Sequence, residues 1–161
     1  MAIYLRFFFI ILLITSVCTA KNLEGRWGAG LVLQDFNNLA ALSFKHHFSQ
    51  HLGVQFLGGF DTQDSSNALI LGGKVTRNAY LEENLNFYIG LGGYIISDKN
   101  NTENTSTGFE LDGLVGAEFF LSGLPNLGFQ FEVGAAMRSL RRVSFKTVGG
   151  TFAGAGIHYY F

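Results

Sequence analysis

The chain has 161 residues, of which 48% are hydrophobic, 15% aromatic and only 14% charged, with a formal net charge of −1. Disordered chains are polar and poor in aromatic residues, so this composition excludes one. The 21 Gly residues follow no three-residue period, which excludes collagen, and the near-neutral charge gives no basic footprint for nucleic acid.

The first 20 residues have the pattern of a secretory signal peptide. Arg6 supplies a positive charge before an apolar run at 7–17, and small residues end the segment. This run is much shorter than the ~20 residues that a membrane-spanning helix needs. We therefore expect export and removal of 1–20, leaving a single domain at 21–161. Lipidation at Cys18 is the alternative.

Alternation of apolar and polar side chains is the dominant pattern of the remaining chain. In 127–138, every second residue is apolar, and Gly, Gln, Glu and Arg lie among the residues between them. A strand places two such sets on opposite faces, whereas a helix mixes them around its circumference. The pattern recurs and predicts eight strands, at 24–34, 39–46, 51–60, 68–78, 85–96, 108–120, 127–138 and 150–161.

The connections between these strands alternate in length. Short turns are expected at 47–50, 81–84 and 121–126, and longer polar loops at 61–67, 97–107 and 139–149. Short turns in the periplasm and longer loops outside are typical of outer-membrane barrels. The predicted fold is therefore all-β, an eight-stranded antiparallel up-and-down transmembrane β-barrel. An even strand number puts both termini on the periplasmic side.

The less apolar face of each strand is rich in Gly and carries balanced charges. Its eight charged residues are Arg26, Lys45, Lys74, Glu110, Asp112, Glu118, Glu132 and Arg138. An eight-stranded interior is just wide enough to be filled by side chains, and buried charges need partners. We predict a lumenal polar network in which Glu110 lies opposite Arg138. The alternatives are a solvated outer face and a soluble ligand carrier, whose lumen should be apolar.

The C-terminal segment carries a resemblance to known proteins. The chain ends in Phe161, with Ile157 and Tyr159 at the alternate positions before it. This pattern resembles the C-terminal assembly signal of Gram-negative outer-membrane proteins. The whole mature chain resembles the small eight-stranded families: the OmpA membrane domain, OmpX, and opacity-type or OmpW-like porin-family proteins. The resemblance implies a monomer in outer-membrane lipid, with recognition by the barrel-assembly machinery during biogenesis.

The expected role is structural or surface-interactive, exercised through the long loops around a mostly plugged lumen. Arg141, Arg142 and Lys146 form a basic cluster in the last loop. Such a cluster attracts anionic surfaces such as lipopolysaccharide, although an ordinary solvated loop is an equal alternative. The extracellular ligand stays unidentified. A narrow porin for small solutes is the second interpretation, because wide aqueous channels need 16–18 strands.

Residues that could support chemistry are few, and we predict no enzymatic activity, cofactor or metal ion. Imidazoles suit Zn or Ni, but His46, His47 and His51 straddle an expected turn. His47-Phe48-Ser49 resembles the His-x-Ser of the lipid A deacylase barrels. In that family the pair lies on a late strand that faces the outer leaflet, whereas here it ends an early strand. A lipid A-modifying enzyme is therefore the least favoured alternative.

Overall fold

A computed structural model gives the structure of the chain at residues 21–34, 40–63, 66–99, 105–140, 143–146 and 153–161. The expected signal segment, residues 1–20, lies outside the described residues. In the described part of the chain, no helix is long and apolar enough to cross a membrane.

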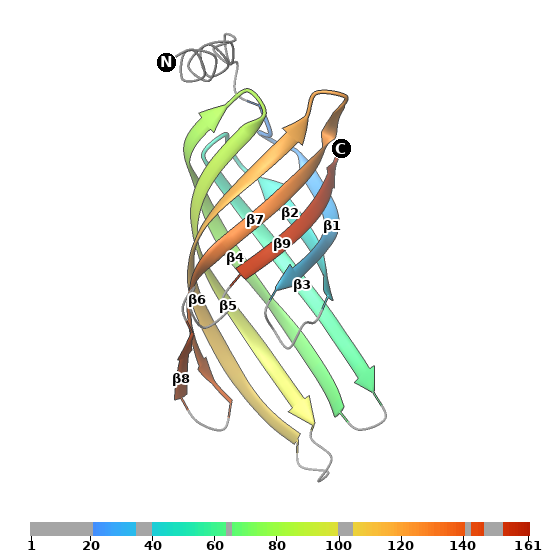
Figure 1. Cartoon of the computed structure of the whole chain (residues 1–161), viewed down its shortest axis with the longest axis vertical. Coiled ribbons are helices and arrows are strands. Elements are labelled where there is room, and N and C mark those ends of the chain that lie inside the picture. Colours follow the sequence, from blue (N-terminus) through green and yellow to red (C-terminus); the bar gives the residue numbers. More distant parts are fainter. Residues whose placement is uncertain (1–20, 35–39, 64–65, 100–104, 141–142, 147–152) are drawn as a thin grey trace, which may run out of the picture.

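The strands form one antiparallel sheet that closes on itself (Figure 1). Each of the first seven strands pairs with the next, and β9 closes the ring by pairing with both β1 and β7. A short strand, β8, pairs only with β7 and lies outside the ring. The strands are β1 (Trp27–Gln34), β2 (Ala40–His47), β3 (Leu52–Gln63), β4 (Ser66–Glu82), β5 (Leu85–Lys99), β6 (Thr105–Leu121), β7 (Leu124–Ser139), β8 (Val143–Lys146) and β9 (Ala153–Tyr160). The eight-stranded antiparallel fold is therefore confirmed.

Strands on one side of the barrel are longer than the alternation predicts. β4 to β7 have 17, 15, 17 and 16 residues, whereas β1, β2 and β9 have eight each. The long strands extend beyond the short ones at the end away from the C-terminus (Figure 1). The long loop predicted at 61–67 is wrong, because β3 and β4 pair as far as Gln63 and Ser66. The loop predicted at 139–149 contains β8. Alternation marks a strand only where its faces meet different surroundings, so polar extensions give no such signal.

The barrel is apolar outside and polar inside. On β2, exposed and buried residues alternate, with Leu42 and Phe44 outward and Ser43 and Lys45 buried. The large exposed hydrophobic side chains include Leu31, Phe56, Leu71, Leu91, Ile95, Leu111, Val115 and Phe131. Water would not stabilise such an exterior, whereas lipid does, because lipid is itself the apolar phase. The charged face lies inside, which excludes the solvated outer face.

Aromatic side chains gather at the end of the barrel that holds Trp27 and Phe161, which we call the terminal end; the opposite end is the loop end. Trp27 and Phe161 join the first and last strands there, and the Phe161 amide donates to the Trp27 carbonyl at 2.9 Å. Phe119 stacks on Phe129 at 5.2 Å between ring centroids. Such belts are typical of the boundary between lipid and water.

The lipid-facing exterior leads to a first prediction. Leu91 is 72% exposed, and its neighbours across the sheet are Val75 and Gly113, in the middle of the outer wall. Leu91→Arg is expected to lower the free energy of unfolding in phospholipid vesicles by about 2–4 kcal/mol, because it puts a charge in hydrocarbon. Guanidinium titration of vesicle-inserted protein measures this. Leu91→Ala is the control, and an equal cost for both variants would contradict a lipid-facing wall.

Candidate functional site in the barrel interior

The interior of the barrel holds seven of the eight charged residues that the sequence assigns to the lumen. Each of the seven is at most 9% exposed; they are Lys45, Lys74, Glu110, Asp112, Glu118, Glu132 and Arg138. Arg26 lies apart from them, half-buried before β1, and donates to Asn126 Oδ1 at 3.0 Å and to the Tyr160 carbonyl at 3.3 Å. The buried set therefore has three basic and four acidic residues instead of the expected balance.

The ion pair between Lys45 and Glu118 crosses the full width of the lumen. Lys45 lies on β2 and Glu118 on β6, and these strands are four places apart in the ring of eight. Lys45 Nζ donates to Glu118 Oε1 at 3.1 Å, and the Tyr160 hydroxyl donates to the same oxygen at 2.8 Å. One carboxylate therefore ties strands from three parts of the wall together.

A second ion pair, between Lys74 and Glu132, is entirely buried. Both side chains are 0% exposed, and Lys74 Nζ donates to Glu132 Oε2. The other carboxylate oxygen, Oε1, accepts a hydrogen bond from the Tyr88 hydroxyl at 2.9 Å. Because both oxygens have donors, the pair meets the condition under which a buried charge is tolerated.

The third ion pair joins neighbouring strands. Arg138 Nε donates to Glu110 Oε2, and the two residues lie directly opposite in the β6–β7 register. The predicted position of Glu110 opposite Arg138 is therefore confirmed. The same register puts Glu118 opposite Gln130.

Glycines in the interior let side chains from two flanking strands meet across the strand between them. Gly116 pairs with Tyr88 on one side and Glu132 on the other, and the Tyr88 hydroxyl reaches Glu132 over it. A Cβ at Gly116 would lie only 2.5–2.7 Å from the Tyr88 ring. Gly30 likewise pairs with both Ser43 and His158, which share a hydrogen bond across it.

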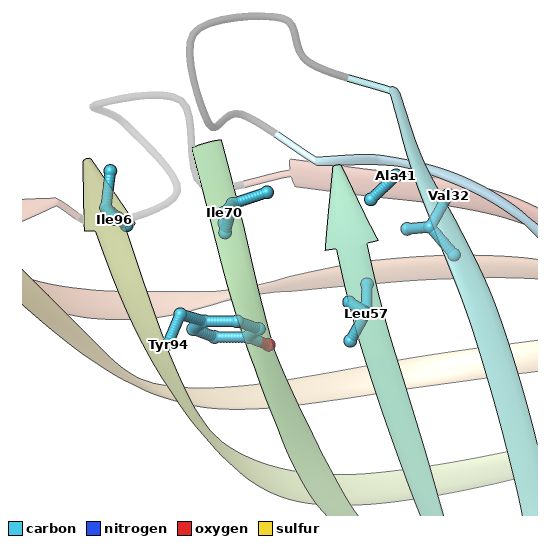
Figure 2. Close-up of a cluster of buried hydrophobic side chains, with 6 residues drawn as sticks. All are labelled: Val32, Ala41, Leu57, Ile70, Tyr94 and Ile96. Atoms are coloured by element: carbon cyan, nitrogen blue, oxygen red, sulfur yellow. The ribbon is translucent and has the colours of Figure 1, made fainter. Parts of the chain in front are cut away.

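The sequence predicts a polar lumen, but the lumen is apolar in part. Six apolar side chains from β1 to β5 form a cluster in the interior toward the loop end (Figure 2), which we call the loop-end cluster: Val32, Ala41, Leu57, Ile70, Tyr94 and Ile96. Leu23, Phe120 and Tyr160 form a second cluster at the terminal end. The alternation already puts such residues as Val32 and Ile70 on the inward face. Charged residues such as Lys74 and Glu132 lie between these two clusters, together with a third buried apolar cluster of Tyr88, Leu114 and Ala136.

Ser43, His158 and Glu118 have the residue types of a nucleophilic triad, an arrangement that the sequence analysis did not predict. Ser43 Oγ lies 2.8 Å from His158 Nε2, and His158 Nδ1 lies 3.7 Å from Glu118 Oε1. The second distance exceeds hydrogen-bond length, and Ser43 and His158 are at most 1% exposed. Gln55 Nε2 also donates to Ser43 Oγ at 2.7 Å. The cluster therefore joins β2, β3 and β9 instead of exposing a nucleophile.

The three histidines near the turn between β2 and β3 do not all lie on one side of the barrel wall. His46 points outward and stacks on Trp27 at 4.3 Å between ring centroids, whereas His47 is buried inside. Within the described residues, no group of three His, Cys, Asp or Glu is arranged to hold a metal ion. Ser49, of the His-x-Ser motif, accepts hydrogen bonds from the His51 and Leu52 amides and so stabilises the turn.

The remaining predicted residues are the C-terminal assembly signal and the basic cluster of the last loop. Ile157, Tyr159 and Phe161 point outward along the last strand at 38%, 54% and 68% exposure. Arg141 and Arg142 lie outside the described residues; the structure describes the backbone of Lys146, in β8, but not its side chain.

An apolar exterior around a closed ring of eight strands, with charged side chains buried inside, defines a transmembrane β-barrel. The N-terminal β-barrel domain of OprF from Pseudomonas aeruginosa is similar to this chain, with a TM-score of 0.65 and 11% identity over 86% of this chain and 98% of that one. A designed transmembrane β-barrel has a TM-score of 0.47 and 19% identity over 86% and 97%. Ail, the attachment invasion locus protein of Yersinia pestis, has a TM-score of 0.41 and 17% identity over 86% and 99%.

The OprF domain confirms the expected resemblance to small outer-membrane barrels at the level of fold. No protein-family model matches the sequence, and neither does any curated protein.

The buried ion pair leads to a second prediction. Glu132→Gln leaves the Lys74 charge in the interior without its counter-charge and is expected to cost about 3–5 kcal/mol of unfolding free energy. Guanidinium unfolding in vesicles measures it. The double variant Lys74→Met with Glu132→Gln removes both charges and should recover much of that loss. If the double variant is as unstable as the single one, the ion pair is not the cause.

The interior glycines lead to a third prediction, tested on one strand. Gly116→Ala pushes a methyl group into the Tyr88 ring and should cost about 1–3 kcal/mol of unfolding free energy. Gly113→Ala, on the outer face of the same strand, is the matched control, because its Cβ would lie 3.7 Å from the nearest side-chain atom, Leu91 Cδ2. The control should be no less stable than the native chain. Equal costs for the two variants would show that crowding is not the constraint.

Proposed function

We propose that the protein is an integral outer-membrane β-barrel that acts as a structural or surface-interaction element, with its loop end outside the cell. One observation supports this proposal: the inward-facing charged side chains are buried and paired across strands, with apolar clusters toward both ends of the barrel. A filled lumen leaves the loop end as the part available to other molecules. The proposal assigns no catalytic activity and no cofactor to the chain.

The proposed orientation puts both termini in the periplasm. In support of it, the two termini of the barrel meet at one end, and short turns connect the strands there at 48–51, 83–84 and 122–123. The proposal takes residues 1–20 as the export signal. It takes Ile157, Tyr159 and Phe161 as the signal for the assembly machinery, supported by their outward position on the strand that closes the ring.

Conductance across planar bilayers tests the filled lumen. The native chain is expected to give no steady large openings, because apolar and paired side chains occupy the cross-section. Removing bulk from the loop-end cluster with Ile70→Ala and Ile96→Ala should increase ion flux. Leu71→Ala and Ile95→Ala, on the outer face of the same strands, are the matched controls and should leave flux unchanged. Steady openings in the native chain would favour the narrow porin instead.

Deletion of 99–106 and, separately, of 139–146 tests the role of the loop end. Each deletion is expected to reduce binding of cells or isolated lipopolysaccharide to the barrel while leaving assembly intact, as judged by heat-modifiable gel mobility. Replacing Arg141, Arg142 and Lys146 together by Gln separates the effect of charge from that of chain length. If both deletions leave binding unchanged, the loop end carries no interaction.

A further inference from the structure

Four glycines face outward on four adjacent strands, where the other outward residues are mostly large and apolar. They are Gly58 on β3, Gly73 on β4, Gly93 on β5 and Gly113 on β6. A Cβ at Gly58, Gly93 or Gly113 would lie 3.5–3.7 Å from its nearest neighbour, an ordinary contact distance. The packing of the chain therefore does not require glycine at these three positions. Glycine within a strand often marks close approach by another molecule.

These glycines lie at the base of two apolar hollows in the outer wall. The hollow over Gly113 has a volume of about 600 Å³ and spans β4 to β7, with Val75, Leu91, Val115 and Val133 among its lining residues. The hollow over Gly58, Gly73 and Gly93 is larger, at about 910 Å³. Both are open to the surface that lipid covers in the proposed membrane orientation.

Arg77 lies at the edge of the smaller hollow and sets it apart from the larger one. Among the outward-facing side chains that the structure describes on the ring strands, Arg77 is the only Lys or Arg, and it is exposed. Arg77 lies in the part of β4 that is nearer the terminal end of the barrel. From Arg77 the hollow extends past Val75, Leu91 and Gly113 toward the middle of the wall. No ion pair or hydrogen bond joins the Arg77 side chain to another residue of the described chain.

The charge and the hollow together match the two parts of a phospholipid. A guanidinium cannot lose its charge in a protein, and its planar fork of donors fits a phosphate. Near the terminal end, the anion within reach of an outward arginine is a lipid phosphate. An acyl chain descending from that phosphate would run along the wall into the apolar hollow, where Gly113 leaves room for it.

We propose that Arg77 and the hollow over Gly113 form a binding site for one anionic phospholipid, with its phosphate on the guanidinium and an acyl chain over Gly113. The inference rests on the proposed membrane location and adds a ligand class and a site to it. Anionic phosphatidylglycerol is preferred over phosphatidylcholine, because the choline cation of the latter repels Arg77. The larger hollow, which has no basic residue in its lining, has no such preference.

The test uses residues 21–161 inserted into vesicles of equal parts phosphatidylglycerol and phosphatidylcholine. Mass spectrometry of the intact protein after gentle detergent release counts the lipids of each kind that stay bound. One surface charge near a membrane is worth about fivefold in lipid association. Arg77→Gln is therefore expected to lower phosphatidylglycerol retention about fivefold, and Arg77→Lys to lower it less.

Two glycine variants separate the hollow from the charge. Gly113→Val fills the hollow beside Arg77 and should reduce retention while Arg77 stays in place. Gly58→Val is the matched control, because it fills the other hollow with similar space for its Cβ, 3.6 Å from Leu71 Cδ1. It should leave retention unchanged.

Retention that is unchanged in Arg77→Gln, or reduced equally by both glycine variants, would overturn the site. Heat-modifiable gel mobility is measured on every sample. Native protein that inserts but shows no lipid preference refutes this inference alone, whereas native protein that fails to insert refutes the proposed function.

Discussion

The interior of an eight-stranded barrel is narrow, and this limit governs the other features of the protein. Lipid accepts apolar side chains on the outer face, so polar and charged groups must fit inside, where the cross-section holds few side chains. A long side chain can cross the lumen only if its neighbours are small. Gly30 and Gly116 meet this need, because Ser43 bonds His158 over the first and Tyr88 bonds Glu132 over the second. The abundance of glycine on the inward face thus follows from the barrel width.

The same limit explains why two of the three ion pairs between Lys or Arg and Glu described above join strands that are not neighbours. Lys45 and Glu118 come from strands on opposite sides of the ring, and Tyr160 donates to the same carboxylate. A buried ion pair adds little stability over apolar packing, but loss of one partner is costly. The charges therefore favour this particular strand arrangement over others. Apolar clusters toward the two ends of the barrel, with Leu57 and Leu23 as examples, lie on either side of these pairs.

The outer face is not covered uniformly by large apolar side chains. A membrane needs only an apolar surface there, and the large side chains of the wall provide it. Outward glycines such as Gly113 weaken the strand without relieving any crowding in the chain. An exposed arginine beside them is costly in lipid unless an anion accompanies it. The proposed lipid site gives both features a physical reason.

The sequence by itself determined the fold class, because the alternation of side chains records which face of each strand meets lipid. It also determined the Glu110–Arg138 pairing, since those strands are adjacent and the hairpin fixes their register. Only the tertiary structure decided the pairs that cross the lumen, such as Lys74 with Glu132, because curvature brings together strands that are not neighbours. It also decided the length of β4 to β7, whose ends leave the apolar band. Outside that band, alternation carries no information, and backbone pairing alone continues the strand.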